Sequence, residues 1–216
     1  MDKNILNSIV RINGQEIKFD WRVPYNKSKN RAIVGSGFFI DDKGHFLTCS
    51  HVIDQSIKIW VTVPETGKQK YQAKIISAYP ESDIALLKIK GYQNTDYLKL
   101  GDSDQVKPSQ SVVALGYSLG VDKLKLSAGI ISGLHDDLIQ TDTPLNRGNS
   151  GGPLIDKNNK VIGINSAVIT PDKSENVGYS VPINFFKRLK NEMNRNSIIY
   201  QPAIGIYYNK TNPYVL

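Results

Sequence analysis

Cysteine is almost absent from this chain of 216 residues, with Cys49 as its single example. One cysteine excludes an intrachain disulfide, so packing must hold the fold together, and a reducing compartment would suit such a protein. Long hydrophobic runs are missing too. The first seven residues carry no apolar stretch long enough for a secretory signal, and no segment reaches the length of a membrane span. We therefore expect a cytoplasmic or otherwise intracellular protein with no membrane partner.

Histidine is scarce as well, and His45, His51 and His135 show no tight ligand spacing with acidic residues. The sequence thus contains no recognisable metal motif, and we expect neither a metal nor an organic cofactor. The net charge is +7, but the basic residues are scattered and form no dense block interleaved with aromatic residues. A solvated basic face explains this charge better than a nucleic-acid site, so no nucleic-acid partner is expected.

Short runs of Val, Ile, Leu, Tyr and Thr, broken by Gly, Pro, Asn and Asp, fill most of the chain. Such runs are typical of an all-β protein, and 40% hydrophobic residues suffice for a core. We expect two antiparallel barrels of about six strands each and one amphipathic C-terminal helix. The expected parts are an N-terminal extension (1–31), a first barrel (32–99), a connector (100–110), a second barrel (111–182), a helix (183–195) and a tail (196–216).

The run Asn-Arg-Gly-Asn-Ser-Gly-Gly-Pro at residues 146–153 surrounds Ser150 with glycines. A serine hydroxyl attacks a carbonyl when a base removes its proton and backbone N–H groups bind the oxygen that becomes negative. Gly148, which has no Cβ, can turn its own N–H and that of Ser150 toward one point, forming an oxyanion hole. The competing interpretation is a Gly/Asn/Ser turn between two strands.

Two further residues stand where they could assist such a serine. His51 follows the apolar run 47–50, where a rigid strand gives way to a short turn or helix and can fix an imidazole at the surface. Asp83 directly precedes the strongly apolar run 84–87, so its carboxylate can be held at the edge of the core. A buried carboxylate needs a partner, and a histidine N–H would make it useful in catalysis.

The order His51, Asp83, Ser150, with the first two in one barrel and the third in the next, resembles the trypsin/chymotrypsin-like serine proteases. Six motifs between residues 35 and 183 look like the HtrA/Deg branch of that family, and the similarity extends to about residue 193. These motifs are Gly-Ser-Gly-Phe-Phe-Ile (35–40), Leu-Thr-Cys-Ser-His-Val (47–52), Asp-Ile-Ala-Leu-Leu-Lys (83–88), Gly-Asn-Ser-Gly-Gly-Pro-Leu (148–154), Gly-Ile-Asn-Ser (163–166) and Gly-Tyr-Ser-Val-Pro-Ile (178–183).

The resemblance implies a role for each residue of the triad. Ser150 would be the nucleophile, His51 would take and return its proton, and Asp83 would orient the imidazole ring. The backbone N–H groups of Gly148 and Ser150, with Asn149 as a further candidate, would bind the oxyanion. The reaction would be hydrolysis of a peptide bond through an acyl-enzyme intermediate.

The same resemblance indicates how a substrate would bind. Ser166, Ala167 and Val168 would pair with an extended protein or peptide segment in an antiparallel ladder. Six positions before Ser150, where enzymes selective for Lys or Arg carry an acid, this chain has Pro144. Leu145 would offer an apolar wall, so cleavage after small or medium aliphatic residues is expected.

Three positions near the serine bear on activation and substrate specificity. Asn149 stands where digestive enzymes carry the aspartate that pairs with a freed N-terminal amine, so activation by processing is not expected. Arg147 stands before the oxyanion glycine, where it either attracts acidic substrate residues or is a solvated loop charge. Asp142 is expected to have a structural role, although it could also lie near the base of the specificity pocket.

A peptide-binding or scaffold protein that keeps the fold without turnover is the rival hypothesis, and the intact set of His51, Asp83 and Ser150 argues against it. Residues 201–206 resemble the start of a PDZ domain, but the remaining tail is too short to fold as one. Homo-oligomers, usually trimers, occur in the family, and the aromatic-bearing residues 19–25 are a candidate for such a contact.

Overall fold

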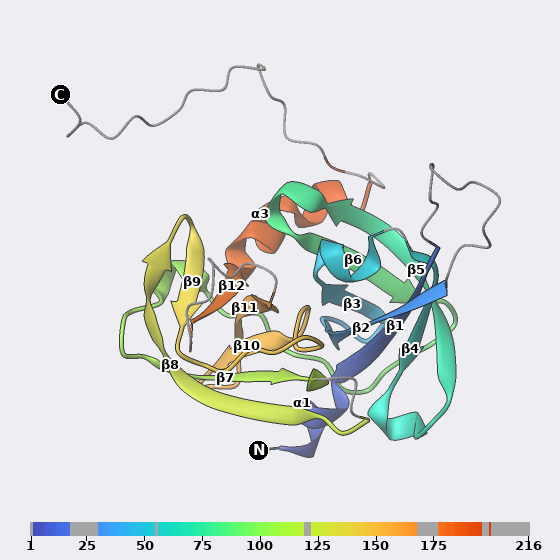
Figure 1. The fold of residues 1–216 in the computed structure, drawn as a ribbon, viewed down its shortest axis with the longest axis horizontal. Helices are drawn as coiled ribbons and strands as arrows, with labels where there is room; N and C mark the ends of the chain where they lie inside the picture. Colours follow the sequence, from blue (N-terminus) through green and yellow to red (C-terminus); the bar gives the residue numbers. More distant parts are fainter. Residues whose placement is uncertain are drawn as a thin grey trace.

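The structure, a computed structural model, describes residues 2–17, 30–54, 56–118, 122–167, 177–195 and 199. Two closed six-stranded antiparallel barrels lie side by side, and a C-terminal helix packs against both (Figure 1). The predicted fold class is confirmed.

The first barrel has the strand order β1-β2-β3-β6-β5-β4, and β1 pairs with β4 to close it. Its strands are β1 (Ile9–Ile17), β2 (Asn30–Phe39), β3 (His45–Thr48), β4 (Ser56–Thr62), β5 (Lys70–Tyr79) and β6 (Ile84–Ile89). Short helices precede β1 and connect later strands: α1 (Lys3–Asn7), α2 (Ser50–Ile53), η1 (Pro64–Thr66) and η2 (Pro80–Ser82). From Lys58 to Thr62 the burial of β4 alternates as expected for a barrel wall, since Ile59 and Val61 are buried while Lys58 is exposed.

The first barrel begins earlier than the expected residue 32, because β1 is one of its six strands. The segment that the sequence assigns to an N-terminal extension therefore contributes to the barrel wall. β1 pairs with β2 from Ile9 opposite Phe38 to Ile17 opposite Asn30, and it also pairs with β4. Partners distant in the sequence thus stabilise this strand, and local composition does not reveal them.

The second barrel has the strand order β10-β11-β12-β9-β8-β7, closed by the pairing of β10 with β7. Its strands are β7 (Ser111–Gly116), β8 (Lys125–His135), β9 (Leu138–Thr141), β10 (Pro153–Asp156), β11 (Val161–Ser166) and β12 (Gly178–Pro182). Asp136 and Asp137, both at positive φ, form the two-residue turn between β8 and β9. The β9–β10 connection contains the run that surrounds Ser150.

Helix α3 (Ile183–Met193) follows β12 and forms at the place that the sequence predicts. Its apolar face buries Ile183, Phe186 and Met193, while Arg188 lies over the ring of Phe185 on the outer side. A large cluster of buried apolar side chains includes residues of both barrels and of α3. The two barrels and the helix therefore share one core, which fixes how the barrels dock.

The connector between the barrels contains η3 (Ser103–Gln105) and is tied to the start of α3. Asn184 donates its side-chain N–H to Asp102 at 2.6 Å and its backbone N–H to Ser103 Oγ at 3.1 Å. In the part of the chain that the structure describes, no helix is both long and apolar enough to cross a membrane.

Candidate active site

His51, Asp83 and Ser150 meet where the two barrels face each other. His51 lies in the single turn of α2, directly after β3, as the sequence predicts. Asp83 caps η2 before β6 and has a left-handed backbone with φ of 54°, which turns the chain sharply into the strand. Ser150 is 96% buried, with 4% of its surface exposed, in the β9–β10 connection.

The carboxylate of Asp83 holds His51 by both its ring and its backbone. Nδ1 of His51 lies 2.8 Å from Oδ2 and 3.0 Å from Oδ1 of Asp83, and the His51 backbone N–H donates to Oδ1 at 2.9 Å. Because a carboxylate only accepts hydrogen bonds, Nδ1 carries the proton and Nε2 is left as the basic nitrogen. This is the tautomer that a general base needs.

The same carboxylate is also bound by the second barrel, since Ser166 Oγ donates to Asp83 Oδ2 at 3.1 Å. Burial raises the pKa of Asp83, but the hydrogen bonds and charge of His51, with a contribution from Cys49, outweigh burial and leave the pKa below its ordinary value. Asp83 therefore stays ionised at neutral pH, where it can stabilise a protonated imidazole.

The end of β11 connects Ser150 with Asp83. Ala167 donates its backbone N–H to Ser150 Oγ at 3.1 Å, and its neighbour Ser166 holds Asp83. Among the described residues, the Ser150 hydroxyl makes no hydrogen bond to His51. Catalytic hydrogen bonds are often loose without substrate and tighten when it binds, so this geometry is compatible with catalysis.

Two of the three proposed oxyanion donors are unpaired. The N–H groups of Gly148 and Ser150 donate to no acceptor within the described residues, whereas Asn149 donates its N–H to the Asn146 carbonyl at 2.9 Å. Gly148 has φ of 100°, a conformation that strongly favours glycine. The structure thus leaves Gly148 and Ser150 available to an oxyanion and uses Asn149 to shape the loop.

The residues expected to contact a substrate lie around this loop. A Cβ added at Gly178 would lie 2.9 Å from Leu145 Cδ1, so the Leu145 side chain packs closely on the backbone of β12. Arg147 is exposed, and Val168 lies outside the described residues. Asp142 accepts the Ile130 backbone N–H at 2.7 Å, which gives it the structural contact that the sequence predicts.

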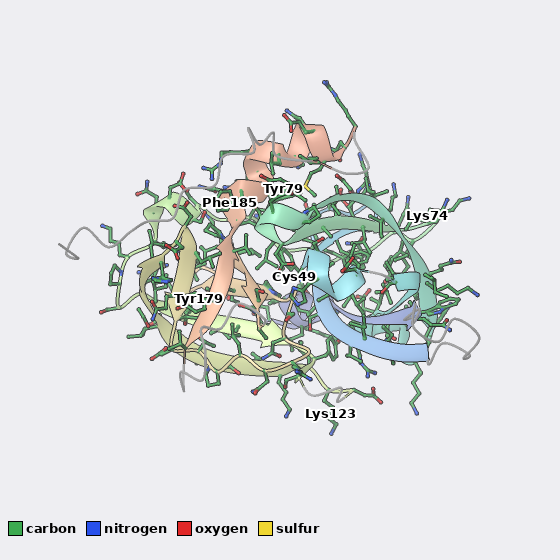
Figure 2. The ribbon with its side chains drawn as sticks, turned by 45° about the horizontal axis from the view of Figure 1, so that its top comes forward. Cys49, Lys74, Tyr79, Lys123, Tyr179 and Phe185 are labelled. Atoms are coloured by element: carbon green, nitrogen blue, oxygen red, sulfur yellow. The ribbon has the colours of Figure 1, made fainter. Side chains whose placement is uncertain are left out.

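Cys49 is fully buried and lies in the middle of the molecule (Figure 2). Its Sγ lies 3.2 Å from the Asn165 carbonyl, and possible ligand atoms of Cys49, His51 and Asp83 lie within 4.8 Å of one another. Burial, and next the charge of Asp83, raise the pKa of the Cys49 thiol well above its ordinary value. A metal would need the thiolate, so the three groups fit a hydrogen-bonded network better than a metal site.

A cavity of about 520 Å³, lined in part by Asp83, lies between η2, the β8–β9 turn and α3. Tyr79 and Phe185, which lie close together near the helix in Figure 2, belong to its lining. Neither His51 nor Ser150 lines this cavity. The reaction chemistry is therefore expected at the barrel interface and not in this cavity.

Comparison with known proteins identifies relatives of this arrangement. Residues 35–164 match the family model described as a trypsin-like peptidase domain. The chain is 35% identical over 190 residues to the periplasmic serine endoprotease DegP of Escherichia coli K12, which covers 83% of the chain and 40% of that protein. It is 34% identical over 185 residues to a probable periplasmic serine endoprotease DegP-like of Chlamydia pneumoniae, covering 81% and 37% of the two chains.

Solved structures agree with these relatives. The HtrA-type protease AlgW with tripeptide superimposes with a TM-score of 0.75 at 26% sequence identity, covering 89% of this chain and 63% of that chain. The chain thus spans about two fifths of the curated relatives' length. The expected cytoplasmic or other intracellular location is wrong in light of these relatives, which are named as periplasmic proteins. A single buried cysteine carried no information on this point, because a fold held by packing needs no disulfide in either compartment.

Proposed function

Because the chain belongs to the family of trypsin-like peptidases and is similar to its DegP and HtrA-type members, we propose that it is a serine endopeptidase. One observation carries this proposal. The Asp83 carboxylate fixes the tautomer of His51 beside a buried serine whose neighbouring N–H groups are unpaired. A base, a nucleophile and oxyanion donors thus lie together.

In the proposed mechanism, Ser150 releases the Ala167 N–H and turns its hydroxyl toward Nε2 of His51. Nε2 takes the proton as Oγ attacks the scissile carbonyl carbon, and Asp83 stabilises the imidazolium that forms. The N–H groups of Gly148 and Ser150 bind the oxyanion of the tetrahedral intermediate. His51 then gives the proton to the leaving amine, and a water molecule hydrolyses the acyl-enzyme by the same steps in reverse order.

We propose that the substrates are unfolded or extended protein segments, as the resemblance to this family implies. Ser166, Ala167 and Val168 would bind the substrate backbone, and Leu145 against β12 would form an apolar wall that favours aliphatic residues before the scissile bond. The contact between Leu145 and Gly178 supports a small pocket. The test compares cleavage of peptides that carry Val before the scissile bond with cleavage of peptides that carry Lys or Arg there. A strong preference for Lys or Arg would overturn this specificity.

The activity itself is tested with the wild-type protein and Ser150→Ala, each incubated with an unfolded protein, followed by mapping of the cut sites by mass spectrometry. Wild-type cleavage that is lost in Ser150→Ala, insensitive to a chelator and accompanied by fluorophosphonate labelling, is the expected result. Cleavage by both proteins would exclude Ser150 as the nucleophile. Cleavage by neither would favour the peptide-binding or scaffold hypothesis, or a latent enzyme.

Arg147 is proposed to attract acidic substrate residues near the cleavage point, since its side chain is exposed directly before Gly148. Arg147→Ala should lower kcat/KM for peptides with acidic residues and leave neutral peptides unchanged. An equal change for both peptides would contradict this role.

We also propose an extracytoplasmic location, by similarity to relatives named as periplasmic. Cell fractionation of the source organism tests it, and recovery only with cytosolic markers would contradict it. Trimer formation through residues 19–25, which lie outside the described residues, stays a prediction that light scattering of the purified protein can check.

A further inference from the structure

Ser36 joins the two barrels at the loop that contains Ser150. It lies in β2 of the first barrel, and none of its surface is exposed to solvent. All three of its polar groups are used. The backbone carbonyl accepts from Thr48 Oγ1 at 2.7 Å within the first barrel, and the other two groups reach the second barrel.

The contacts with the second barrel hold residues 146–152, here called the oxyanion loop, at two positions. Ser36 Oγ donates to the Gly148 carbonyl at 2.6 Å, and the Ser36 backbone N–H donates to the Ser150 carbonyl at 2.9 Å. Ser36 Oγ also accepts the Tyr117 backbone N–H at 2.8 Å. One residue therefore binds the loop at both ends of Asn149 and links it to the end of β7.

These two carbonyls lie in the peptides on either side of the one that carries the Ser150 N–H. Peptide groups are planar, so a fixed Gly148 carbonyl fixes the peptide that leads into Asn149, and a fixed Ser150 carbonyl fixes the peptide after Ser150. The peptide between them carries the Ser150 N–H, and its Asn149 carbonyl also accepts the Gly152 N–H at 3.0 Å, so it has little freedom left. Gly148, at φ of 100°, has the most freedom to turn its own N–H away, and its carbonyl is the one that Ser36 Oγ holds.

Among the described residues, no charged side chain hydrogen-bonds the carbonyl of Gly148 or of Ser150. The residue before Ser150 is the neutral Asn149, whose buried Oδ1 has no hydrogen-bond partner within the described residues. An ion pair at this side chain therefore cannot order the loop. The direct hydrogen bonds from the first barrel to the two carbonyls come from Ser36.

We propose that Ser36 is a positioning residue that keeps the N–H groups of Gly148 and Ser150 directed at the oxyanion, through its hydroxyl bond to the Gly148 carbonyl. This inference rests on the proposed peptidase function. A hydroxyl suits the position because it donates to one group and accepts from another at once. Without it, the buried Gly148 carbonyl and Tyr117 N–H would both lose their partners.

The test compares Ser36→Ala with Ser77→Ala as a matched control. Ser77 is equally buried in the same barrel, and its Oγ has no hydrogen-bond partner within the described residues. Ser36→Ala should lower kcat by about 10- to 100-fold with KM changed by less than about threefold, because the loop holds the donors correctly for only a fraction of the time. Ser77→Ala should keep the wild-type kcat.

Two further readouts separate positioning from simple loss of stability. A peptide aldehyde, whose adduct with Ser150 places an oxygen in the oxyanion hole, should lose affinity for Ser36→Ala by the same factor as kcat. Amide hydrogen exchange of residues 146–152 should be faster in Ser36→Ala and unchanged in Ser77→Ala. Ser36→Thr keeps the hydroxyl and should retain more activity than Ser36→Ala.

The possible failures are distinguishable. Wild-type kcat and aldehyde affinity in folded Ser36→Ala would overturn the positioning role while leaving the peptidase function intact. Equal kcat for Ser36→Ala and Ser36→Thr would also overturn it. No cleavage by the wild-type protein would overturn the peptidase function, and the role of Ser36 with it.

Discussion

Gly151, which directly follows Ser150, allows a sharp test of why this loop is rich in glycine. Its φ is 84°, and a Cβ at this position would lie 2.1 Å from Thr48 Oγ1 and 2.2 Å from the Ser36 carbonyl oxygen. The positive φ alone costs a side chain about 1–2 kcal/mol, partly offset by about 0.4–1 kcal/mol from a less flexible unfolded chain. Crowding against backbone adds about 1–3 kcal/mol. We expect Gly151→Ala to lower the free energy of unfolding by about 2–4 kcal/mol.

Two other glycines separate these contributions. Gly91 has φ of 72° with nothing within 4 Å of an added Cβ, so Gly91→Ala carries only the backbone strain. Gly152 lacks a positive φ, but its added Cβ would lie 2.0 Å from the Leu115 carbonyl oxygen, so Gly152→Ala carries only the crowding. The loss of stability should increase in the order Gly91→Ala, Gly152→Ala, Gly151→Ala.

Thermal unfolding followed by circular dichroism measures this order. For a chain of this size, 1 kcal/mol corresponds to a shift in Tm of roughly 2–4 °C, so Gly151→Ala should unfold roughly 5–15 °C below the wild type. A Tm for Gly151→Ala equal to that of Gly91→Ala would refute the reasoning. It would mean that the loop moves away from Ser36 and Thr48 at no cost.

Three other outcomes follow from the site. Asp83→Asn should lower kcat by about 10⁴-fold with little change in KM, because the amide no longer fixes the tautomer of His51, and a fall below tenfold would contradict this. The pKa of Asp83 is lowered in the folded protein, so its stabilising effect is complete above the unfolded pKa near 4 and is lost as the pH falls through the folded pKa. Urea unfolding between pH 2 and 5 should therefore depend less on pH in Asp83→Asn than in the wild type, and equal slopes would contradict this assignment. Cys49, fully buried with a raised pKa, should resist iodoacetamide in the native protein and react once it is unfolded, whereas rapid native labelling would show that the barrels separate easily.

The sequence predicted two barrels of about six strands and the C-terminal helix, whereas β1 lies outside the predicted bounds of its barrel. Asn13 and Gly14 interrupt this segment with residues that favour turns. In the barrel, Gly14 leaves room for β4, because a Cβ there would lie 2.5 Å from Ser56 Oγ. A glycine that suggests a turn locally is thus a strand residue, paired with Ile33 of β2 and Ile59 of β4.

The candidate site likewise has parts that the sequence predicts and parts that it does not. His51, Asp83 and Ser150 could be chosen from the sequence because each belongs to a distinctive run, and the described contacts bring them to one interface. The hydrogen bond of the Asn149 N–H could not be predicted from the sequence in this way. It depends on the loop closing back onto the Asn146 carbonyl, a backbone contact that side-chain identity does not encode.

The contacts that order the site are those that join the two barrels. Ser36 binds Gly148, Ser166 binds Asp83 and Cys49 contacts Asn165, with sequence separations of 112, 83 and 116 residues. Each barrel could form its own strands without any of these contacts, because the strand ladders are internal to each barrel. Docking of the barrels, which the shared apolar core drives, is therefore the step that brings together the proposed nucleophile, base and oxyanion donors. A substitution at the interface can for this reason reduce turnover while both barrels remain folded.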